Sequence, residues 1–303
     1  MAKSSWDLSG RTVLITGAAR GIGAECARRL AARGARVALA GLEPEELERV
    51  ATQCGPEAVW FDCDVTDSDA VERAVEGAVE RFGGIDCVIA NAGIAPTGMV
   101  RSIDPAAFEA TIDVNLLGVF RTVQACLPQV IERRGYVLVI ASMAAPLHAP
   151  GMSAYSAAKA GAEAFADSLR VEVRHLGVDV GVAYFSFIDT DMVRGGDAHP
   201  VFGRVREKLG GPLGRTHPVS EVGDAVLAGM EARRRWIVVP GWARALLMLR
   251  GMLQPVSDLA GRREAPEMDR SFAAYAAERG TEEASAPVGL GGDAMRDRAV
   301  NRT

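Results

Sequence analysis

The sequence predicts an α/β fold in which a single domain carries one doubly wound, seven-stranded, mostly parallel sheet with helices on both faces. Three observations lead to this prediction. Short apolar, β-branched runs alternate with longer Ala-rich stretches from Arg11 to about Val239. The short runs are continuously apolar, which is typical of parallel strands that are buried on both faces. The longer stretches have the length of crossover helices, and right-handed crossovers place helices on both faces of a sheet.

Strand and helix candidates follow one another along the chain. We expect strands at 11–17, 35–41, 58–65, 85–93, 135–142, 178–187 and 235–241. We expect helices at 21–34, 43–55, 67–83, 105–133 and 153–177. Gly34 suits the C-terminal cap of the first helix, and the acidic residues that begin at Glu43 suit the positive end of the second helix dipole.

Composition excludes several classes of protein. The chain has 303 residues, of which 49% are hydrophobic and 24% charged, with a net charge of -5. A negative chain is a poor partner for nucleic acid, because such binders usually present a basic face. Five cysteines without a Cys-x-x-Cys pair, and four histidines without ligand spacing, predict reduced thiols, no metal site and a cytoplasmic location. We find no signal-peptide pattern and no apolar run long enough to span a membrane.

A change of composition near Pro255 predicts where the domain ends. Beyond it the chain is charged, rich in Gly and Ala, and poor in large apolar residues. We therefore expect one dinucleotide-binding domain with a built-in substrate pocket at 1–255. The extension at 256–303 is expected to be partly disordered or peripheral.

A glycine-rich turn joins the first strand to the first helix. Gly17, Gly21 and Gly23 permit a tight turn and a close approach to a diphosphate, and the helix N-terminus supplies free N–H groups. The strand–turn–helix context makes the motif specific for a dinucleotide. The predicted cofactor contacts in this turn are Thr16, Gly17, Arg20, Gly21, Ile22 and Gly23.

The ends of the second and third strands bear on the choice of cofactor. A carboxylate at the end of the second strand would bind the 2′-hydroxyl of NAD and repel the 2′-phosphate of NADP. The strand ends instead at Gly41, and Arg20 can reach a 2′-phosphate, so the sequence favours NADP(H) over NAD(H), although Glu43 lies close. We expect Asp64 and Val65 at the adenine ring, with helix capping as the alternative role of Asp64.

A tyrosine and a lysine lie four residues apart in the helix expected at 153–177. Tyr155 and Lys159 therefore share one face. A tyrosine with a pKa near 10 is a poor base, but a nearby ammonium group lowers that pKa. Ser142 ends the fifth strand, and Asn115 lies within the fourth helix. Each residue alone has a structural explanation, but their joint occurrence favours a catalytic group.

With these motifs the chain resembles the classical short-chain dehydrogenase/reductase family, which has a Rossmann-type fold. The matching motifs occur in the family's order and spacing, and they are Thr16–Gly23, Asn91-Ala92-Gly93, Asn115, Ser142, Tyr155 and Lys159. The resemblance implies an oxidoreductase that transfers a hydride between NAD(H) or NADP(H) and an alcohol or carbonyl carbon. It also implies that Asn91, Ala92 and Gly93 line the cofactor, and that the protein forms a homodimer or homotetramer.

The resemblance implies one role for each candidate catalytic residue. Tyr155 would be the general acid or base, and Lys159 would lower its pKa and hold the nicotinamide ribose. Ser142 would orient the substrate oxygen, and Asn115 would anchor a water in a proton relay towards Lys159.

The chain departs from the family's pattern after the sixth strand, where Phe185-Ser186 replaces Pro-Gly. Serine tolerates a positive φ less well than glycine, so we expect Ser186 to be extended. Phe185 should then pack beside or under the nicotinamide. Ile188, through its backbone, and Thr190 are expected to hold the carboxamide or a phosphate.

Mostly apolar residues follow the ends of the late strands and predict a lipophilic small-molecule substrate. The predicted substrate contacts are Ser142, Met143, His148, Phe185, Phe187 and Met192. The stretch 194–216, which holds eight Gly or Pro residues, is expected to form a mobile lid.

Two alternatives remain open at this point. Residues 233–253 combine Arg, Trp and apolar residues, so weak contact with a membrane surface competes with subunit packing or pocket closure. A non-catalytic nucleotide-sensing or interaction protein on the same fold is the alternative function. The presence of Tyr155 and Lys159 speaks against that alternative, and the glycine spacing speaks against an epimerase or dehydratase.

Overall fold

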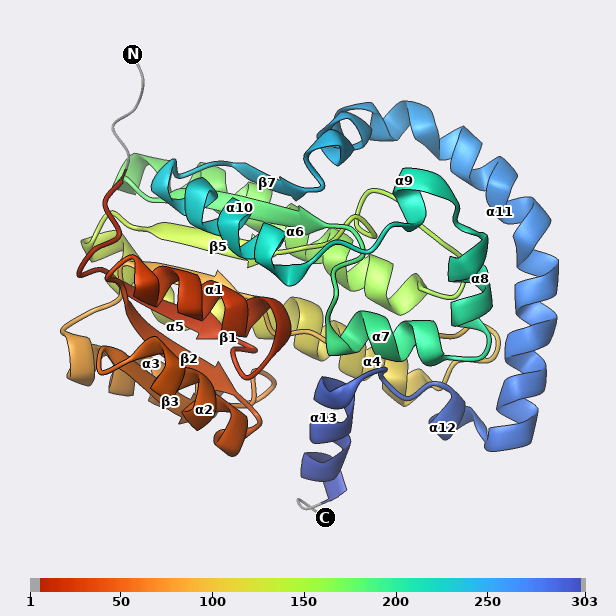
Figure 1. The fold of residues 1–303 in the computed structure, drawn as a ribbon, viewed down its shortest axis with the longest axis horizontal. Coiled ribbons are helices and arrows are strands. Elements are labelled where there is room, and N and C mark those ends of the chain that lie inside the picture. The colour runs from red at the N-terminus through yellow and green to blue at the C-terminus, as the bar shows by residue number, and fades with distance from the viewer. Residues whose placement is uncertain (1–5, 301–303) are drawn as a thin grey trace.

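A single seven-stranded sheet forms the centre of the molecule (Figure 1). This computed structural model describes residues 6–300, apart from the side chains of 253, 254, 256–258, 260, 263, 299 and 300. The strands are β1 (Thr12–Thr16), β2 (Arg36–Gly41), β3 (Ala58–Asp62), β4 (Cys87–Ala90), β5 (Tyr136–Ile140), β6 (Asp179–Phe185) and β7 (Trp236–Val239). Their order is β3-β2-β1-β4-β5-β6-β7, and all neighbouring pairs are parallel. The predicted doubly wound α/β fold is confirmed.

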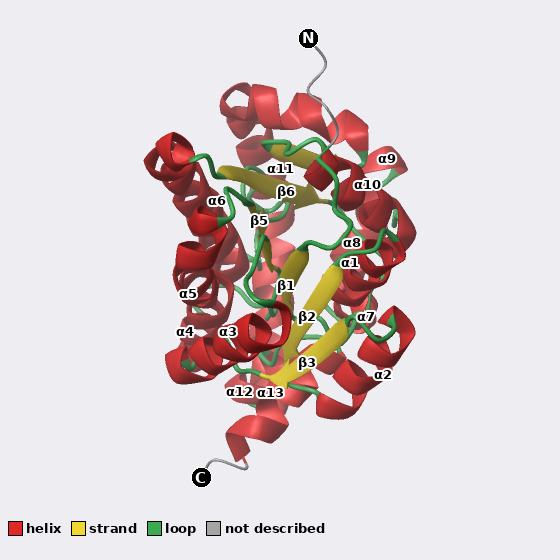
Figure 2. Cartoon of the chain, turned by 90° about the vertical axis from the view of Figure 1, so that its left-hand side faces the viewer, coloured by secondary structure: helices red, strands yellow, loops and turns green. Residues whose placement is uncertain are grey.

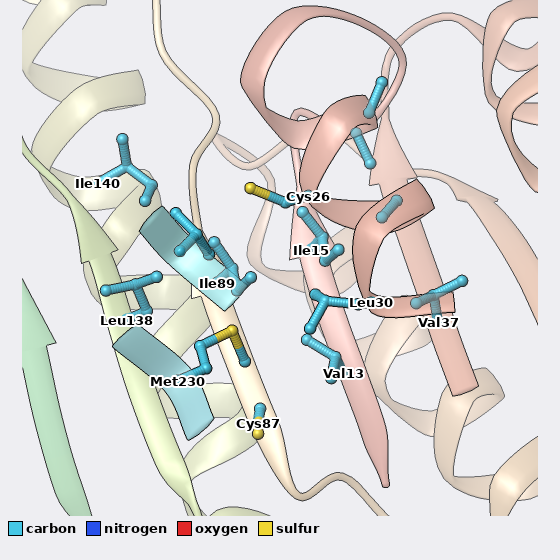
Figure 3. Close-up of a cluster of buried hydrophobic side chains, with 14 of the residues drawn as sticks. Val13, Ile15, Cys26, Leu30, Val37, Cys87, Ile89, Leu138, Ile140 and Met230 are labelled. Carbon is cyan, nitrogen blue, oxygen red and sulfur yellow. The ribbon is translucent and has the colours of Figure 1, made fainter. Parts of the chain in front are cut away.

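Helices cover both faces of the sheet (Figure 2). One face carries α1 (Gly21–Ala32), α2 (Pro44–Cys54) and α10 (Val219–Glu231). The other carries α3 (Ser68–Phe82), α5 (Gly118–Glu132) and α6 (Ser153–Val173). Successive side chains of a strand point to opposite faces, so Val13 and Ile15 pack under α1 while Leu14 enters the other core (Figure 3).

The order of the strands reverses between β1 and β4, because the chain first builds the sheet outward to β3 and then returns. Ligands of open α/β sheets bind outside the carboxyl ends of the strands at such a reversal. The glycine turn after β1 and the loop after β4 meet at this edge of the sheet. The fold thus predicts the location of the site.

The helix expected at 105–133 has three parts. It consists of α4 (Pro105–Ile112), a π-helical segment η1 (Asp113–Leu117) and α5. Asn115 lies in the π-helical segment, a kind of bulge that often occurs at functional sites. By length and composition alone, the stretch Pro105–Glu132 could cross a membrane, and it was the one such helix found among the described residues. Its helices pack against α3, α6 and the sheet, as core helices do.

Most of the C-terminal extension is helical in the residues that the structure describes. The boundary expected at 255 falls inside the long helix α11 (Arg244–Arg279), which arches around the molecule and is followed by α12 (Thr281–Ala284) and α13 (Leu290–Val300) (Figure 1). Met268 and Phe272 of α11 are buried against Val201. The stretch 194–216, expected to be a lid, takes in the second half of α7 (Asp191–Ala198) and all of α8 (Phe202–Lys208) and α9 (Gly211–Gly214).

Candidate active site

One cavity of about 230 Å³ lies at the carboxyl edge of the sheet. All the predicted cofactor contacts line it except Thr16 and Gly23; the lining set is Gly17, Arg20, Gly21, Ile22, Gly41, Asp64, Val65, Asn91, Ala92, Gly93, Tyr155, Lys159, Ile188 and Thr190. Residues that are far apart in the sequence therefore meet in one cleft. Among the described residues, no group of three or more His, Cys, Asp or Glu side chains could hold a metal.

The glycine turn is shaped by close backbone contacts. Gly17 has a φ of +63°, and a Cβ there would lie 2.8 Å from the Cα of Ala92. A Cβ on Gly23 would overlap the carbonyl oxygen of Gly17. Gly23 and Thr16 therefore build the turn rather than line the cavity: the Thr16 Oγ1 accepts hydrogen bonds from the backbone N–H groups of Asn91 (3.1 Å) and Ala92 (3.2 Å).

The start of helix α1 fits a diphosphate. Arg20 occupies the N-cap position but makes no side-chain capping bond, so the first N–H groups of the helix have no side-chain acceptor. Such free N–H groups, at the positive end of a helix dipole, bind phosphate oxygens. The Asn91 Nδ2 donates to the carbonyl oxygens of Thr16 (2.9 Å) and Gly17 (3.1 Å), which fixes the turn in this shape.

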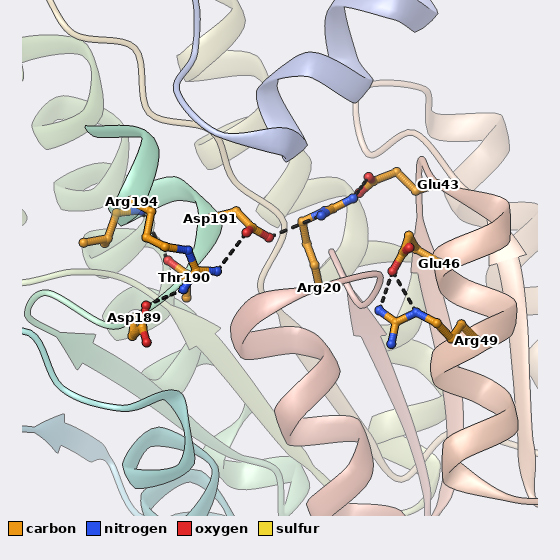
Figure 4. A network of polar contacts seen from close by, with 9 residues as sticks. Arg20, Glu43, Glu46, Arg49, Asp189, Thr190, Asp191 and Arg194 are labelled. Atoms are coloured by element: carbon orange, nitrogen blue, oxygen red, sulfur yellow. Dashed lines mark hydrogen bonds and ion pairs between the residues drawn. The ribbon is translucent and has the colours of Figure 1, made fainter. Parts of the chain in front are cut away.

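A network of charges occupies the adenosine end of the cleft (Figure 4). The Arg20 Nε donates to the Glu43 Oε2 at 2.9 Å, and the Nη1 of the same guanidinium donates to the Asp191 Oδ2 at 3.2 Å. Its hydrogen bond with Glu43 raises the pKa of Arg20 further. Asp191 also accepts a hydrogen bond from Arg194 at 2.8 Å. Arg20 was expected to be available for a 2′-phosphate, but here two carboxylates already hold it.

The catalytic candidates meet at the opposite end of the cleft. Tyr155 and Lys159 lie one turn apart on α6, with the Lys159 Nζ 5.8 Å from the centroid of the Tyr155 ring. The Lys159 Nζ donates to the carbonyl oxygen of Ile140, at the end of β5, at 2.8 Å. Ser142, just beyond β5, hydrogen-bonds Tyr155. The Ser142 Oγ also accepts the N–H of Ala144 at 3.1 Å, which orients the hydroxyl.

Burial has the largest effect on the pKa values of Tyr155 and Lys159. It raises the pKa of Tyr155, and the hydrogen bond from Ser142 lowers that pKa by less. Burial also lowers the pKa of Lys159 to about 8. We expected Lys159 to lower the pKa of Tyr155, and in this arrangement the net shift runs the other way, because removal of water disfavours the phenolate. At neutral pH Tyr155 is therefore a proton donor.

Asn115 supports the loop after β4. Its Oδ1 accepts the N–H of Ile94 at 2.8 Å, and its Nδ2 donates to the carbonyl oxygen of the same residue at 2.8 Å. The side-chain amide is fully buried and bound to one peptide. The first role of Asn115 is thus to shape the loop that carries Gly93. This loop comes close to the catalytic lysine, since a Cβ added to Gly93 would lie 3.5 Å from the Lys159 Nζ. The expected water relay stays a prediction.

The segment after β6 lines the same cavity. Ser186 has no positive φ, as expected, and its N–H donates to the carbonyl oxygen of Val239 at 2.9 Å. Phe185 is 4% exposed and belongs both to the core and to the cavity wall. Thr190 caps α7, because its Oγ1 accepts the N–H of Val193 at 3.4 Å.

The predicted substrate contacts divide into two groups. Ser142, Phe185 and Met192 line the cavity. Met143 does not, because its side chain is buried in the core on the α3, α5 and α6 face of the sheet. His148 is exposed, with its Nε2 3.1 Å from the carbonyl oxygen of Ala145. Phe187 packs under Arg206, whose guanidinium carbon lies 3.7 Å from the ring centroid.

Comparisons with known proteins agree with this geometry. The short chain dehydrogenase family model matches residues 11–199, which hold the glycine turn and all four catalytic candidates. The chain belongs to the classical short-chain dehydrogenase/reductase family. It is therefore an oxidoreductase family member with a Rossmann-type fold, as its motifs indicated.

Relatives within the short-chain dehydrogenase/reductase family show how widely the domain is shared. The chain is 32% identical to a 3-oxoacyl-(acyl-carrier-protein) reductase of Escherichia coli over 229 residues, covering 75% of this chain and 93% of that one. It is 31% identical to 11-beta-hydroxysteroid dehydrogenase 1A of Arabidopsis thaliana over 250 residues, covering 78% and 70%. A solved short-chain dehydrogenase/reductase from Mycobacterium marinum matches with 30% identity and a TM-score of 0.70, covering 77% of this chain and 95% of that chain.

Sequence reasoning missed two parts of the dehydrogenase cleft. The missed lining residues of the domain are Ala19, Leu42, Glu43, Cys63, Val114, Ile140, Ala141, Ser186 and Asp191. Glu43 and Asp191 neighbour predicted contacts, so a wider window around each motif would have found them. The residues missed in the C-terminal extension are Val288, Gly291, Gly292, Ala294 and Met295. Nothing in their sequence pattern indicates a cofactor site.

Proposed function

We propose that this chain uses NAD(H) or NADP(H) to interconvert a carbonyl and an alcohol on a lipophilic small molecule. The carrying observation is that Ser142, Tyr155 and Lys159 face the same cleft as the uncapped start of α1. The bound cofactor supplies the hydride donor or acceptor. Ser142 holds the substrate oxygen, and Tyr155 gives it a proton or takes one from it. Because Tyr155 is protonated at neutral pH, it can donate the proton that reduction of a carbonyl requires.

The walls of the cavity support the choice of a lipophilic substrate. Beside the catalytic group the cavity is lined by Ile94, Phe185, Met192 and Val193, all apolar. Apolar walls with a few convergent polar groups are usual for small-molecule sites. The names of two relatives, a 3-oxoacyl-(acyl-carrier-protein) reductase and an 11-beta-hydroxysteroid dehydrogenase, also describe an oxygen function on a hydrocarbon skeleton.

The charges at the adenosine end support NAD(H), whereas the sequence favoured NADP(H). Glu43 and Asp191 already hold Arg20. A neighbouring cavity of about 510 Å³ has four carboxylates and two guanidinium groups in its walls, from Glu43, Asp62, Asp293, Asp297, Arg20 and Arg298. A 2′-phosphate would add negative charge to this excess, while a 2′-hydroxyl can donate to Glu43.

The direct test measures binding and turnover separately. NADH fluorescence on mixing reports binding, and NADH oxidation with a panel of apolar ketones reports turnover. We expect Tyr155→Phe to keep NADH binding and to lose turnover by about 10²–10⁴-fold. Ser156→Ala is the matched control, because its buried hydroxyl on the same helix turn has no hydrogen-bond partner among the described residues. Full turnover in Tyr155→Phe would refute the proposal, and binding without turnover in the wild type would favour the nucleotide-sensing alternative.

Exposed apolar side chains support two further proposals. Leu117 and Phe120, on η1 and α5, are 42% and 41% exposed, which suits a homodimer or homotetramer interface on this face. Within the stretch 233–253, Met248 and Met252 are 71% and 76% exposed on α11, which suits weak contact with a membrane surface. Sedimentation and vesicle flotation of the purified chain test these two proposals, and cell fractionation tests the cytoplasmic location.

A further inference from the structure

Part of the C-terminal extension lies across the cofactor cleft. We call residues 285–298 the C-terminal segment; it comprises the loop before α13 and that helix as far as Arg298. Val288, Gly292 and Met295 line the same cavity as the glycine turn and Asp64. In Figure 1, α13 lies beside α7, and the two helices are in contact.

Three contacts attach this segment to elements that border the cleft. The backbone N–H of Asp104, before α4, donates to the Ser285 Oγ at 2.9 Å, and Ser285 is 1% exposed. The N–H of Val288 donates to the carbonyl oxygen of Ala95, in the loop after β4, at 3.2 Å. At the far end Arg298 pairs with Asp62, the last residue of β3. The segment thus bridges the cleft from β4 to β3.

A close backbone contact joins the segment to α7. Gly289 has a φ of +81°, and a Cβ there would lie 2.6 Å from the carbonyl oxygen of Asp191. A Cβ on Gly195 would lie 2.5 Å from the backbone nitrogen of Gly289. Only glycine fits this crossing. Since Asp191 also holds Arg20, the segment touches the residue that orders the adenosine end.

The segment also covers the adenine wall and narrows the cleft. Met295 packs against Val65, Ile94 and Val114, and Val65 is an expected adenine contact. With the segment in place the cavity measures about 230 Å³. A second cavity of about 510 Å³ adjoins it, shares Arg20, Leu42, Glu43 and Ala294 with it, and is also lined by Asp293 and Asp297 of the segment. The segment therefore forms one wall of the cleft along its adenosine half.

We infer that the C-terminal segment is a moving part of the cofactor site. It lifts to admit the dinucleotide and then closes over the adenosine half, with Met295 against the adenine wall, so that it slows cofactor release. This inference rests on the proposed use of NAD(H) or NADP(H). Gly280, with a φ of +85° and no atom within 4 Å of an added Cβ, lies between α11 and α12 and leaves room for a hinge.

The decisive experiment measures the rate of NADH release by stopped-flow fluorescence in the full-length protein. Gly289→Val should prevent docking and raise the release rate about tenfold or more, with a matching rise in Kd. Gly251→Ala is the control, because this exposed glycine of α11 has no atom within 4 Å of an added Cβ. An unchanged rate of NADH release from Gly289→Val would overturn the inference. Tighter NADH binding by this variant would also overturn it, because the segment would then compete with the cofactor for the cleft.

Two measurements keep the inference testable if Gly289→Val fails to fold. Arg298→Gln and Asp62→Asn each break the same half-exposed pair, and both should raise the release rate by about two- to fivefold. Hydrogen exchange of residues 285–298 in the wild type should slow when NADH is added. If added NADH slows exchange at the glycine turn but not in the C-terminal segment, the inference is overturned. The proposed function would still stand, because NADH would have bound. No binding of NADH or NADPH by the wild type would instead refute the proposed function.

Discussion

At the catalytic end of the cleft a buried lysine is held by a backbone carbonyl, whereas at the adenosine end partly exposed side chains are held by ion pairs. Lys159 is 3% exposed and donates to a main-chain oxygen at the end of β5. Arg20 and Glu43, by contrast, have side chains that are 24% and 18% exposed, and they share a network with Asp191. The catalytic groups are therefore tuned by desolvation, and the adenosine end is tuned by the charge of its neighbours.

The strongest test of this contrast is the pH dependence of stability that Lys159 confers. Its pKa is lowered from 10.5 to about 8, so between these values the unfolded chain binds more protons than the native protein. The contribution of Lys159 to the free energy of unfolding should then rise by up to about 1.4 kcal/mol per pH unit between pH 8 and 10.5. Urea denaturation of the wild type and Lys159→Met, without cofactor, measures the difference at each pH.

Lys159→Met removes both the ionisable ammonium group and its hydrogen bond to Ile140. Only the protonation of the ammonium group makes the difference in stability depend on pH. We expect the stability of the wild type relative to Lys159→Met to increase by about 2–3 kcal/mol from pH 7.5 to pH 10. Lys208, an exposed lysine paired with Glu264 and Glu267, provides the control variant Lys208→Met. A difference that stays constant with pH would show that the catalytic end is wetter than its burial indicates.

The glycine turn lies between the two ends and tests whether backbone shape alone holds the diphosphate. Gly17→Ala forces a side chain into a φ of +63° and places its Cβ 2.8 Å from the backbone of Ala92. We expect a loss of about 1–3 kcal/mol in the free energy of unfolding and at least a tenfold loss of NADH affinity. Gly10→Ala is matched in backbone angle, with a φ of +70°, but has no neighbour within 4 Å. Equal losses in both variants would show that the approach to Ala92 is unimportant.

The same contrast explains what the sequence could predict. The catalytic end and the glycine turn depend on short spacings within one strand–helix unit, so Tyr155, Lys159 and Gly17 were placed by pattern alone. The shift in the pKa of Tyr155 could not be predicted this way, because it depends on how much water the folded cleft excludes. Continuous apolar runs predicted the seven strands and their parallel sheet, since buried parallel strands have a distinctive composition.

The site residues that the sequence did not predict depend on contacts between distant parts of the chain. Met295 reaches the adenine wall only because α11 carries the chain around the molecule, and its own segment is polar and Gly-rich, as in a solvated tail. The partners of Arg20 show the same limit: Glu43 is near in sequence, but Asp191 comes from the far end of the domain. The ion-pair partners of Arg20 therefore cannot be predicted from its position in the glycine turn, because one of them comes from a distant segment.

The smallest predicted effect tests the adenosine end directly. Glu43→Gln should remove one negative charge and free Arg20 for a 2′-phosphate, so we expect the ratio of NADPH to NADH affinity to rise by about three- to tenfold. Glu46→Gln is the matched control, because Glu46 lies one turn along α2 and pairs with Arg49 instead (Figure 4). Fluorescence titrations with both cofactors measure the ratio. An unchanged ratio would show that Glu43 does not set the cofactor preference. A wild type that already prefers NADPH would show the same, because Arg20 would then leave Glu43 for the 2′-phosphate without hindrance.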